Sequence, residues 1–97
     1  MNRVSYHPAV PLEVQEFAEY YGAISARLET RFRSELLKAI DGAKNHPERH
    51  HFDRTGLRRC NLRRFPVHIL FRLTPEGIRI TAVRHDRRDP DYGAGRR

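Results

Sequence analysis

The fold is decided in residues 67–83, where the chain reads Val67-His68-Ile69-Leu70-Phe71-Arg72-Leu73-Thr74-Pro75-Glu76-Gly77-Ile78-Arg79-Ile80-Thr81-Ala82-Val83. Apolar residues alternate with other residues on both sides of Thr74–Gly77, and a period of two is typical of strands with one buried face. Pro and Gly in that segment are residues that reverse turns use. The stretch therefore predicts an antiparallel hairpin with an inward apolar face that consists of Val67, Ile69, Phe71, Ile78 and Ile80.

The opposite face of this hairpin should carry His68, Leu70, Arg72, Arg79, Thr81 and Val83. We expect it to be half open to solvent, with titratable and cationic groups available to a ligand. Just upstream, Leu57–Leu62 predicts a further strand, although its alternation is imperfect. That strand would add some of Arg58, Arg59, Asn61 and Arg63 to the same side, so function is expected on this face.

Further upstream, the apolar spacing changes to three and four, which marks helices with one buried face. One stripe runs from Val10 to Ile24 and another from Leu28 to Ala43, and Gly22 and Ser25 separate them. The pattern predicts helices at 8–21 and 25–45, after a short strand at 2–6, and a polar loop at 47–56. The predicted order is β-α-α-β-β-β, an α+β fold in which one sheet face packs on a helical hairpin. We expect residues 1–97 to form a single domain, with 93–97 a mobile tail.

The net charge of +7 is unevenly distributed along the chain. Residues 1–46 carry 6 basic and 6 acidic side chains, whereas residues 47–97 carry 13 basic side chains, all arginine, and 6 acidic ones. Arginine presents a planar set of donors that fits phosphate or carboxylate groups. The C-terminal half therefore predicts an anionic partner, either nucleic acid or an acidic protein segment, with a merely solvated surface as the alternative.

Several classes of protein are not favoured by the sequence. The chain contains no apolar run of transmembrane or signal-peptide length, so we expect a cytoplasmic protein that does not contact membranes. Cys60 is the only cysteine, and we expect it to be a buried strand residue. His46, His50 and His51 lie near one another, but no carboxylate or cysteine completes a ligand set, so neither a metal nor another cofactor is expected.

Two C-terminal blocks carry a resemblance to a known family. They are Arg63-Arg64-Phe65-Pro66-Val67-His68-Ile69-Leu70-Phe71-Arg72 and Ala82-Val83-Arg84-His85-Asp86-Arg87-Arg88-Asp89-Pro90-Asp91-Tyr92. With His7-Pro8-Ala9, Tyr20-Tyr21, Arg31-Phe32, Leu36 and His46-Pro47, they resemble the RelE/ParE toxins over residues 3–92. The resemblance implies a growth-inhibiting toxin of a type II toxin–antitoxin (plasmid-stabilisation) system, with the same β-α-α-β-β-β fold.

The resemblance also implies partners. The cognate antitoxin should neutralise the toxin through an acidic amphipathic segment, in a complex that can be of higher order. RelE-like members cut mRNA on the ribosome without a metal, whereas ParE-like members poison DNA gyrase and have no established hydrolytic residues. Whether the chain is an enzyme therefore depends on which branch it follows.

Residue by residue, the match to the RelE-like branch is partial. Arg59, Arg88 and Tyr92 fall at or near family positions, whereas Asn61 and His68 replace expected cations, and Gly93 replaces an aromatic residue. If the chain were a ribonuclease, His68, His85 and Tyr92 would be its catalytic candidates, because histidine can transfer protons near neutral pH. Phosphate or target binding is expected from arginines of the second half: Arg59, Arg63, Arg72, Arg79 and Arg88.

These departures favour gyrase inhibition slightly over mRNA cleavage. A third hypothesis is a degenerate, non-toxic module that binds only antitoxin and operator complex. Each candidate residue also has a structural interpretation: His68 as a solvated or structural residue, His85 bonded to Asp86, and Tyr92 as a packing ring.

Overall fold

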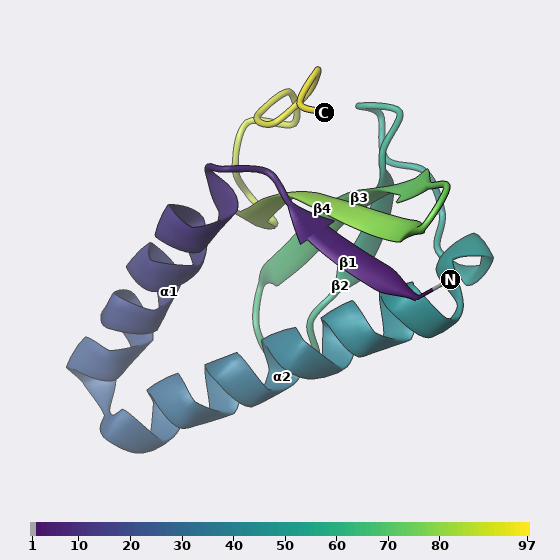
Figure 1. The fold of residues 1–97 in the computed structure, drawn as a ribbon. Coiled ribbons are helices and arrows are strands. Elements are labelled where there is room, and N and C mark those ends of the chain that lie inside the picture. The colour runs from purple at the N-terminus through teal and green to yellow at the C-terminus, as the bar shows by residue number, and fades with distance from the viewer. Residues whose placement is uncertain (1) are drawn as a thin grey trace.

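The computed structural model describes residues 2–97. The chain forms, in order, β1 (Arg3–Tyr6), α1 (Val10–Ile24), α2 (Ala26–Asn45), a short 3-10 turn (Pro47–Arg49), β2 (Arg58–Asn61), β3 (Val67–Thr74) and β4 (Gly77–His85). The predicted β-α-α-β-β-β order is confirmed, and the strand and helix boundaries lie within a few residues of those expected. In Figure 1 the two helices form a V beside a single twisted sheet.

The sheet has the strand order β1-β4-β3-β2. β3 pairs antiparallel with both β2 and β4, and the turn between β3 and β4 lies where Pro75 and Gly77 predicted it. β1 pairs parallel with β4, so the N-terminal strand forms one edge of the sheet, and the two helices follow it in the chain. The outer side of β1 remains an open edge that lies alongside α2 (Figure 1).

Ser25 is the residue at which the helical hairpin turns. It ends α1 by donating its backbone N–H to the carbonyl of Tyr21, and its extended backbone breaks the helix. Its side-chain oxygen accepts the N–H of Leu28, so the same residue is the N-cap of α2. A serine at this position satisfies one of the N–H groups that a helix start leaves without a partner.

The core lies between the helices and one face of the sheet, as predicted. Val67, Ile69, Phe71, Ile78 and Ile80 are at most 1% exposed. Phe32 and Leu36 are buried against them, and Phe17, Leu28 and Ile40 pack at the margin. Phe32 is the centre of an aromatic cluster, because its ring contacts three others, those of Phe17, Tyr21 and Phe65.

The prediction of a half-open second sheet face was wrong for four of its residues. His68, Leu70 and Thr81 are fully buried, and Val83 is 2% exposed. A register irregularity between β3 and β4 pairs Leu70 with Ala82 and Phe71 with Ile80, which leaves Thr81 as the extra residue. Because this extra residue shifts the alternation by one, Val83 joins the helix-facing core and Ala82 faces the other way with Leu70.

The chain itself covers this second face. Leu57, from the loop before β2, packs on Leu70 and Ala82. The segment after β4 folds back over the sheet, with Gly93 close to the Ala82 methyl group. Residues 93–97 were expected to be mobile; in the structure, Arg96 is half-buried and hydrogen-bonded to Glu13.

Within residues 2–97, no helix combines the length and apolar character that a bilayer-spanning segment needs.

Candidate functional site

His68 lies at the centre of a buried polar network on the second sheet face. Its Nε2 accepts a hydrogen bond from Arg84 Nε at 2.7 Å, and its Nδ1 lies 2.8 Å from a carboxylate oxygen of Asp86. Since a guanidinium only donates, the ring must be neutral, with its proton on Nδ1, which donates to Asp86. Both ring nitrogens are therefore engaged by protein groups, and no edge of the imidazole faces solvent.

Electrostatics keep this histidine neutral. Burial lowers the pKa of His68 most strongly, the positive charges of Arg59 and Arg84 lower it further, and the hydrogen bond to Asp86 opposes the change without reversing it. A neutral ring is what the Arg84 contact requires, because an imidazolium has no free lone pair to accept that N–H.

Arg84 connects the network to the chain segments that cover it. Besides His68, it donates to the carbonyl oxygens of Pro90 and Tyr92 and to Asp53 Oδ1, at 2.9 to 3.0 Å. Burial alone would raise the pKa of Asp53, but hydrogen bonds from Thr55 and the adjacent guanidinium of Arg84 outweigh it, so the pKa is lowered. Every guanidinium nitrogen of Arg84 thus has a partner, and its role is to hold the C-terminal segment and the 53–57 turn on the sheet.

A second buried group, Glu13 of α1, fixes the same segment from the other side. Its Oε1 accepts the backbone N–H of Val83 at 3.0 Å, beside the extra residue of β4. Its Oε2 accepts from the Tyr92 hydroxyl and from the Arg96 guanidinium, the latter at 2.7 Å. The Tyr92 hydroxyl is therefore bonded within the protein, and its ring lies beneath the Arg88 guanidinium, which is 4.0 Å from the ring centroid.

A cleft of about 520 Å³ opens between α1 and this C-terminal segment. It brings together three of the predicted residues, His85, Arg88 and Tyr92, whereas His68 does not line it. His85 is half-buried, and its Nδ1 accepts the N–H of Arg87 rather than contacting Asp86. We call this the α1 cleft; its other lining residues include aromatic side chains and two carboxylates: Phe17, Tyr20, Tyr21, Glu13 and Glu16.

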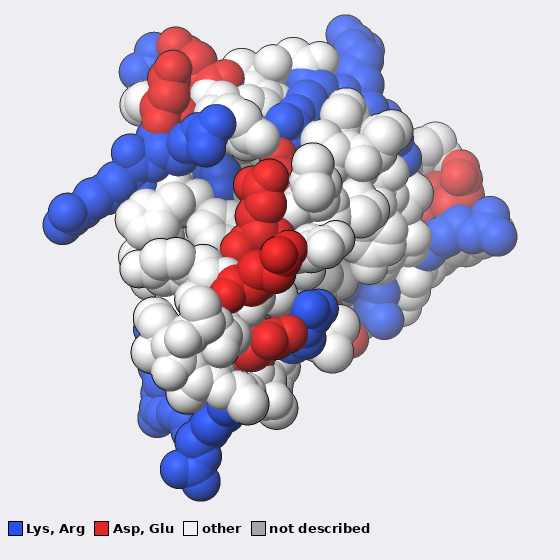
Figure 2. All heavy atoms as spheres, turned by 90° about the vertical axis from the view of Figure 1, so that its left-hand side faces the viewer, with Lys and Arg blue, Asp and Glu red and all other residues white. Residues whose placement is uncertain are grey.

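The rim of the α1 cleft is apolar and acidic. Tyr20 and Ile24 are 65% and 62% exposed, and Glu16 and Glu19 are exposed on the same helix. Figure 2, which faces this side of the molecule, shows carboxylates in a stripe between uncharged surfaces, with Lys and Arg side chains at the periphery. An entering phosphodiester would therefore meet the exposed carboxylates of Glu16 and Glu19 as well as Arg88, whereas the charge of Glu13 is already paired with Arg96.

The other predicted arginines are dispersed over the molecule. Arg59 is bonded to Asn61 and Asp86, so its charge is partly neutralised. Arg72 and Arg79 are cross-strand neighbours, half-buried, and within residues 2–97 neither has an acidic partner. The Arg72 Nε is buried without a hydrogen-bond partner among these residues. Arg63 lines another groove, where α2 meets the β2–β3 loop.

Sequence reasoning missed the residues that close the second face: Glu13, Asp53 and Arg84. Glu13 resembles an ordinary acidic residue in the first turn of a helix, where it favours the helix dipole. Arg84 could have been found, since it is the cross-strand partner of His68 and would face the same side.

Comparison with protein-family models gives no match, and comparison with curated proteins gives none either.

Proposed function

We propose that this chain is a RelE/ParE-like toxin of a type II toxin–antitoxin system that acts in the cytoplasm by binding a protein target, with DNA gyrase as the candidate. The main observation against mRNA cleavage is that His68 is fully buried, with both ring nitrogens hydrogen-bonded to protein groups. A general acid or base must reach the proton that it transfers. Because arginines are poor bases, the arginines around His68 cannot replace it in proton transfer; His85, the other histidine candidate, lines the α1 cleft together with the exposed carboxylate of Glu16.

The composition of the α1 cleft supports a protein target. Exposed Tyr20 and Ile24 flank an opening that also holds Tyr92 and Arg88. Tyrosine and arginine are the residue types over-represented among the residues that contribute most to protein–protein binding. In contrast, the exposed carboxylate of Glu16 in the cleft lining would repel the phosphates of mRNA. We therefore assign target binding to the α1 cleft.

A gyrase supercoiling assay with purified chain tests this assignment. Inhibition is expected for the natural sequence, and Tyr20→Ser or Arg88→Ala should weaken it by about 30-fold, the effect of losing a residue worth about 2 kcal/mol. Arg33→Ala is the matched control, because Arg33 is exposed on α2, does not line the α1 cleft and should leave inhibition unchanged. Full supercoiling activity at saturating protein would exclude gyrase as the target.

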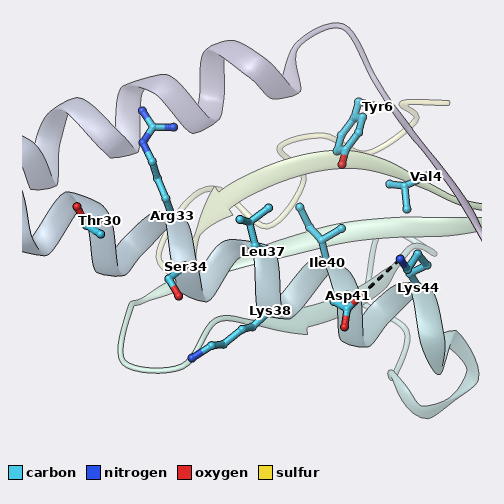
Figure 3. Close-up of a pocket in the computed structure, with 10 residues that line it drawn as sticks. All are labelled: Val4, Tyr6, Thr30, Arg33, Ser34, Leu37, Lys38, Ile40, Asp41 and Lys44. Atoms are coloured by element: carbon cyan, nitrogen blue, oxygen red, sulfur yellow. Dashed lines mark ion pairs between the residues drawn. The ribbon is translucent and has the colours of Figure 1, made fainter.

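The antitoxin is proposed to occupy a different groove, of about 730 Å³, between β1 and α2. Figure 3 shows Leu37 and Ile40 of α2 pointing toward Val4 and Tyr6 of the edge strand, with Arg33 and Lys44 on the same side; Lys38 also lines the groove. The only carboxylate there, Asp41, pairs with Lys44 at 3.5 Å. An acidic amphipathic segment would match both the apolar floor and the cationic margin.

Antitoxin binding can be tested separately from toxicity. Leu37 is 67% exposed, so Leu37→Asp should leave the fold intact while placing a carboxylate in the path of an acidic segment. Growth arrest by this variant should persist when the antitoxin is co-expressed. Complete rescue by the antitoxin would contradict the proposed groove.

A further inference from the structure

A fourth surface, distinct from the second sheet face and the α1 cleft and adjoining the groove between β1 and α2, is strongly cationic. It is a groove of about 570 Å³ where α2 meets the β2–β3 loop. Its basic residues are Arg27, Arg31 and Lys38 of α2 and Arg63 and Arg64 of the loop. We call it the cationic groove. Thr30 and Ser34 add hydroxyl groups, and Glu35 is the one carboxylate in its lining.

The arginines of the cationic groove have no acidic partners among residues 2–97. The Glu35 Oε2 atom lies 3.6 Å from Lys38 Nζ, so this carboxylate is paired with the lysine. No carboxylate among residues 2–97 is paired with Arg27, Arg31, Arg63 or Arg64. Elsewhere in the molecule, arginines such as Arg54, Arg59 and Arg84 do have acidic partners. Like charges one helical turn apart, as in Arg27 and Arg31, destabilise a helix. A bound anion would relieve this repulsion.

The helical part of the groove is linear. Arg27, Arg31, Ser34 and Lys38 follow one another at steps of four, three and four residues, which places them on one stripe of α2. At 1.5 Å per residue the stripe is roughly 16 Å long. In Figure 3, Ser34 and Lys38 point away from the side of α2 that carries Arg33 and Leu37. The cationic groove therefore adjoins the groove assigned to the antitoxin and shares Thr30, Ser34 and Lys38 with it, whereas Arg27, Arg31, Arg63 and Arg64 line the cationic groove and not the other.

The loop part of the groove is held rigidly. Leu62 and Phe65 are 5% and 7% exposed, so the turn between them is anchored in the core at both ends. Arg64 has φ of 69°, a left-handed conformation that non-glycine residues rarely adopt. The two guanidiniums are thus displayed on a turn whose backbone is fixed before any ligand binds, which lowers the entropy lost on binding.

We propose that the cationic groove binds the sugar–phosphate backbone of a double-stranded nucleic acid without reading its sequence. A row of cations and hydroxyl donors is the arrangement that contacts phosphates. The groove has no aromatic lining residue on which unpaired bases could stack, which disfavours a single strand. It also has no apolar lining residue, so an acidic amphipathic protein segment would find nothing there to cover.

This binding does not rest on the proposed protein target. The cationic groove would bind a duplex whether the α1 cleft contacts gyrase or another protein, and this binding is measured without any toxicity assay. A failure of the gyrase experiment therefore leaves it standing, and the reverse also holds.

The experiment measures binding of fluorescein-labelled 20-base-pair duplexes of one random sequence, as DNA and as RNA, by polarization between 50 and 300 mM salt. Two double variants neutralise the groove from different elements: Arg27→Gln with Arg31→Gln, and Arg63→Gln with Arg64→Asn, asparagine being tolerant of the left-handed backbone. The control, Arg49→Gln with Arg97→Gln, removes the same charge from exposed residues outside the groove. Circular dichroism verifies that each variant is folded.

Each phosphate contact contributes a factor of about eight between 1 M and 0.1 M salt, so each groove variant, which loses two contacts, should bind about 60-fold more weakly at 0.1 M. The slope of log K against log salt should fall in magnitude by about two, while the control changes affinity less than threefold. Tighter binding of RNA or of DNA then assigns the duplex type. The proposal would be overturned if the control and the groove variants lost affinity equally, or if single strands bound as tightly as the duplex. It would also be overturned if polyglutamate displaced the duplex at equal charge concentration.

Discussion

The buried carboxylate of Glu13 provides the sharpest test of how the C-terminal segment is held. Glu13→Gln keeps the size of the side chain but removes its charge and replaces one acceptor oxygen with a donor. The amide oxygen can still accept the Val83 N–H, whereas the bonds from the Tyr92 hydroxyl and the Arg96 guanidinium to the second oxygen are lost. Because the Glu13 and Arg96 side chains are 8% and 18% exposed, solvent screens this pair only weakly.

The expected loss in the free energy of unfolding follows from these contacts. A hydrogen bond to a charged group contributes about 1.5–3 kcal/mol, and breaking a buried pair costs about 3–5 kcal/mol because one charge stays unpaired. Since Arg96 can swing toward water, we take the lower limit, about 3 kcal/mol. For a domain near 100 residues, that is a Tm lower by roughly 12–24 °C.

The assay is thermal unfolding of Glu13→Gln beside Glu16→Gln, a variant of an exposed carboxylate one turn further along α1. The control should unfold within about 2 °C of the natural sequence, as surface substitutions do. Trypsin digestion should also cleave after Arg87 and Arg88 much faster in Glu13→Gln, because the segment is released from the sheet. Equal melting temperatures and equal cleavage rates for the two variants would refute the reasoning.

Three further predictions concern the core, the buried histidine and the edge strand. Phe32→Ala, at the centre of the aromatic cluster, should cost about 3–5 kcal/mol in urea unfolding, enough to leave the domain largely unfolded; a loss below 1 kcal/mol would contradict the packing. Because the pKa of folded His68 lies below the unfolded value of about 6.5, the unfolded state takes up the proton first. The contribution of neutral His68 to the free energy of unfolding is therefore fully present above about pH 6.5 and is lost as the pH falls toward the folded pKa. His68→Gln should flatten this pH dependence, and an unchanged pH profile would contradict the assignment. Gly77→Ala would place a methyl group 2.1 Å from the Arg3 carbonyl oxygen, so hydrogen exchange of β1 amides should accelerate; protection equal to that of the natural sequence would disprove the close approach.

The sequence predicted the fold well because its periodicities are local. The alternation in 67–83 and the three-and-four spacing of the helices identified the core residues from Phe32 to Ile80, and Ser25 marked the helical turn. The sequence did not predict the register irregularity at Thr81. Such an insertion depends on how two strands pair, which the alternation of one strand does not record.

The second sheet face was harder to predict because long-range contacts determine it. His68 has the alternation of an exposed strand residue, yet it is buried by Arg84, Asp86 and a C-terminal segment that charge and glycine content suggested would be mobile. Glu13 and Arg96 are 83 residues apart in the chain, and nothing in either local pattern indicates that they meet. The meeting of His85, Arg88 and Tyr92 in one cleft follows from the same fold-back.

The central proposal, that this chain stops growth by binding a protein and not by cutting RNA, is tested most directly by primer extension on mRNA from cells in which the natural sequence is induced. The account predicts full-length mRNA without cleavage ends that increase after induction, and the same result in Tyr92→Phe. Induced cleavage within codons, lost on Tyr92→Phe while growth arrest also disappears, would contradict it.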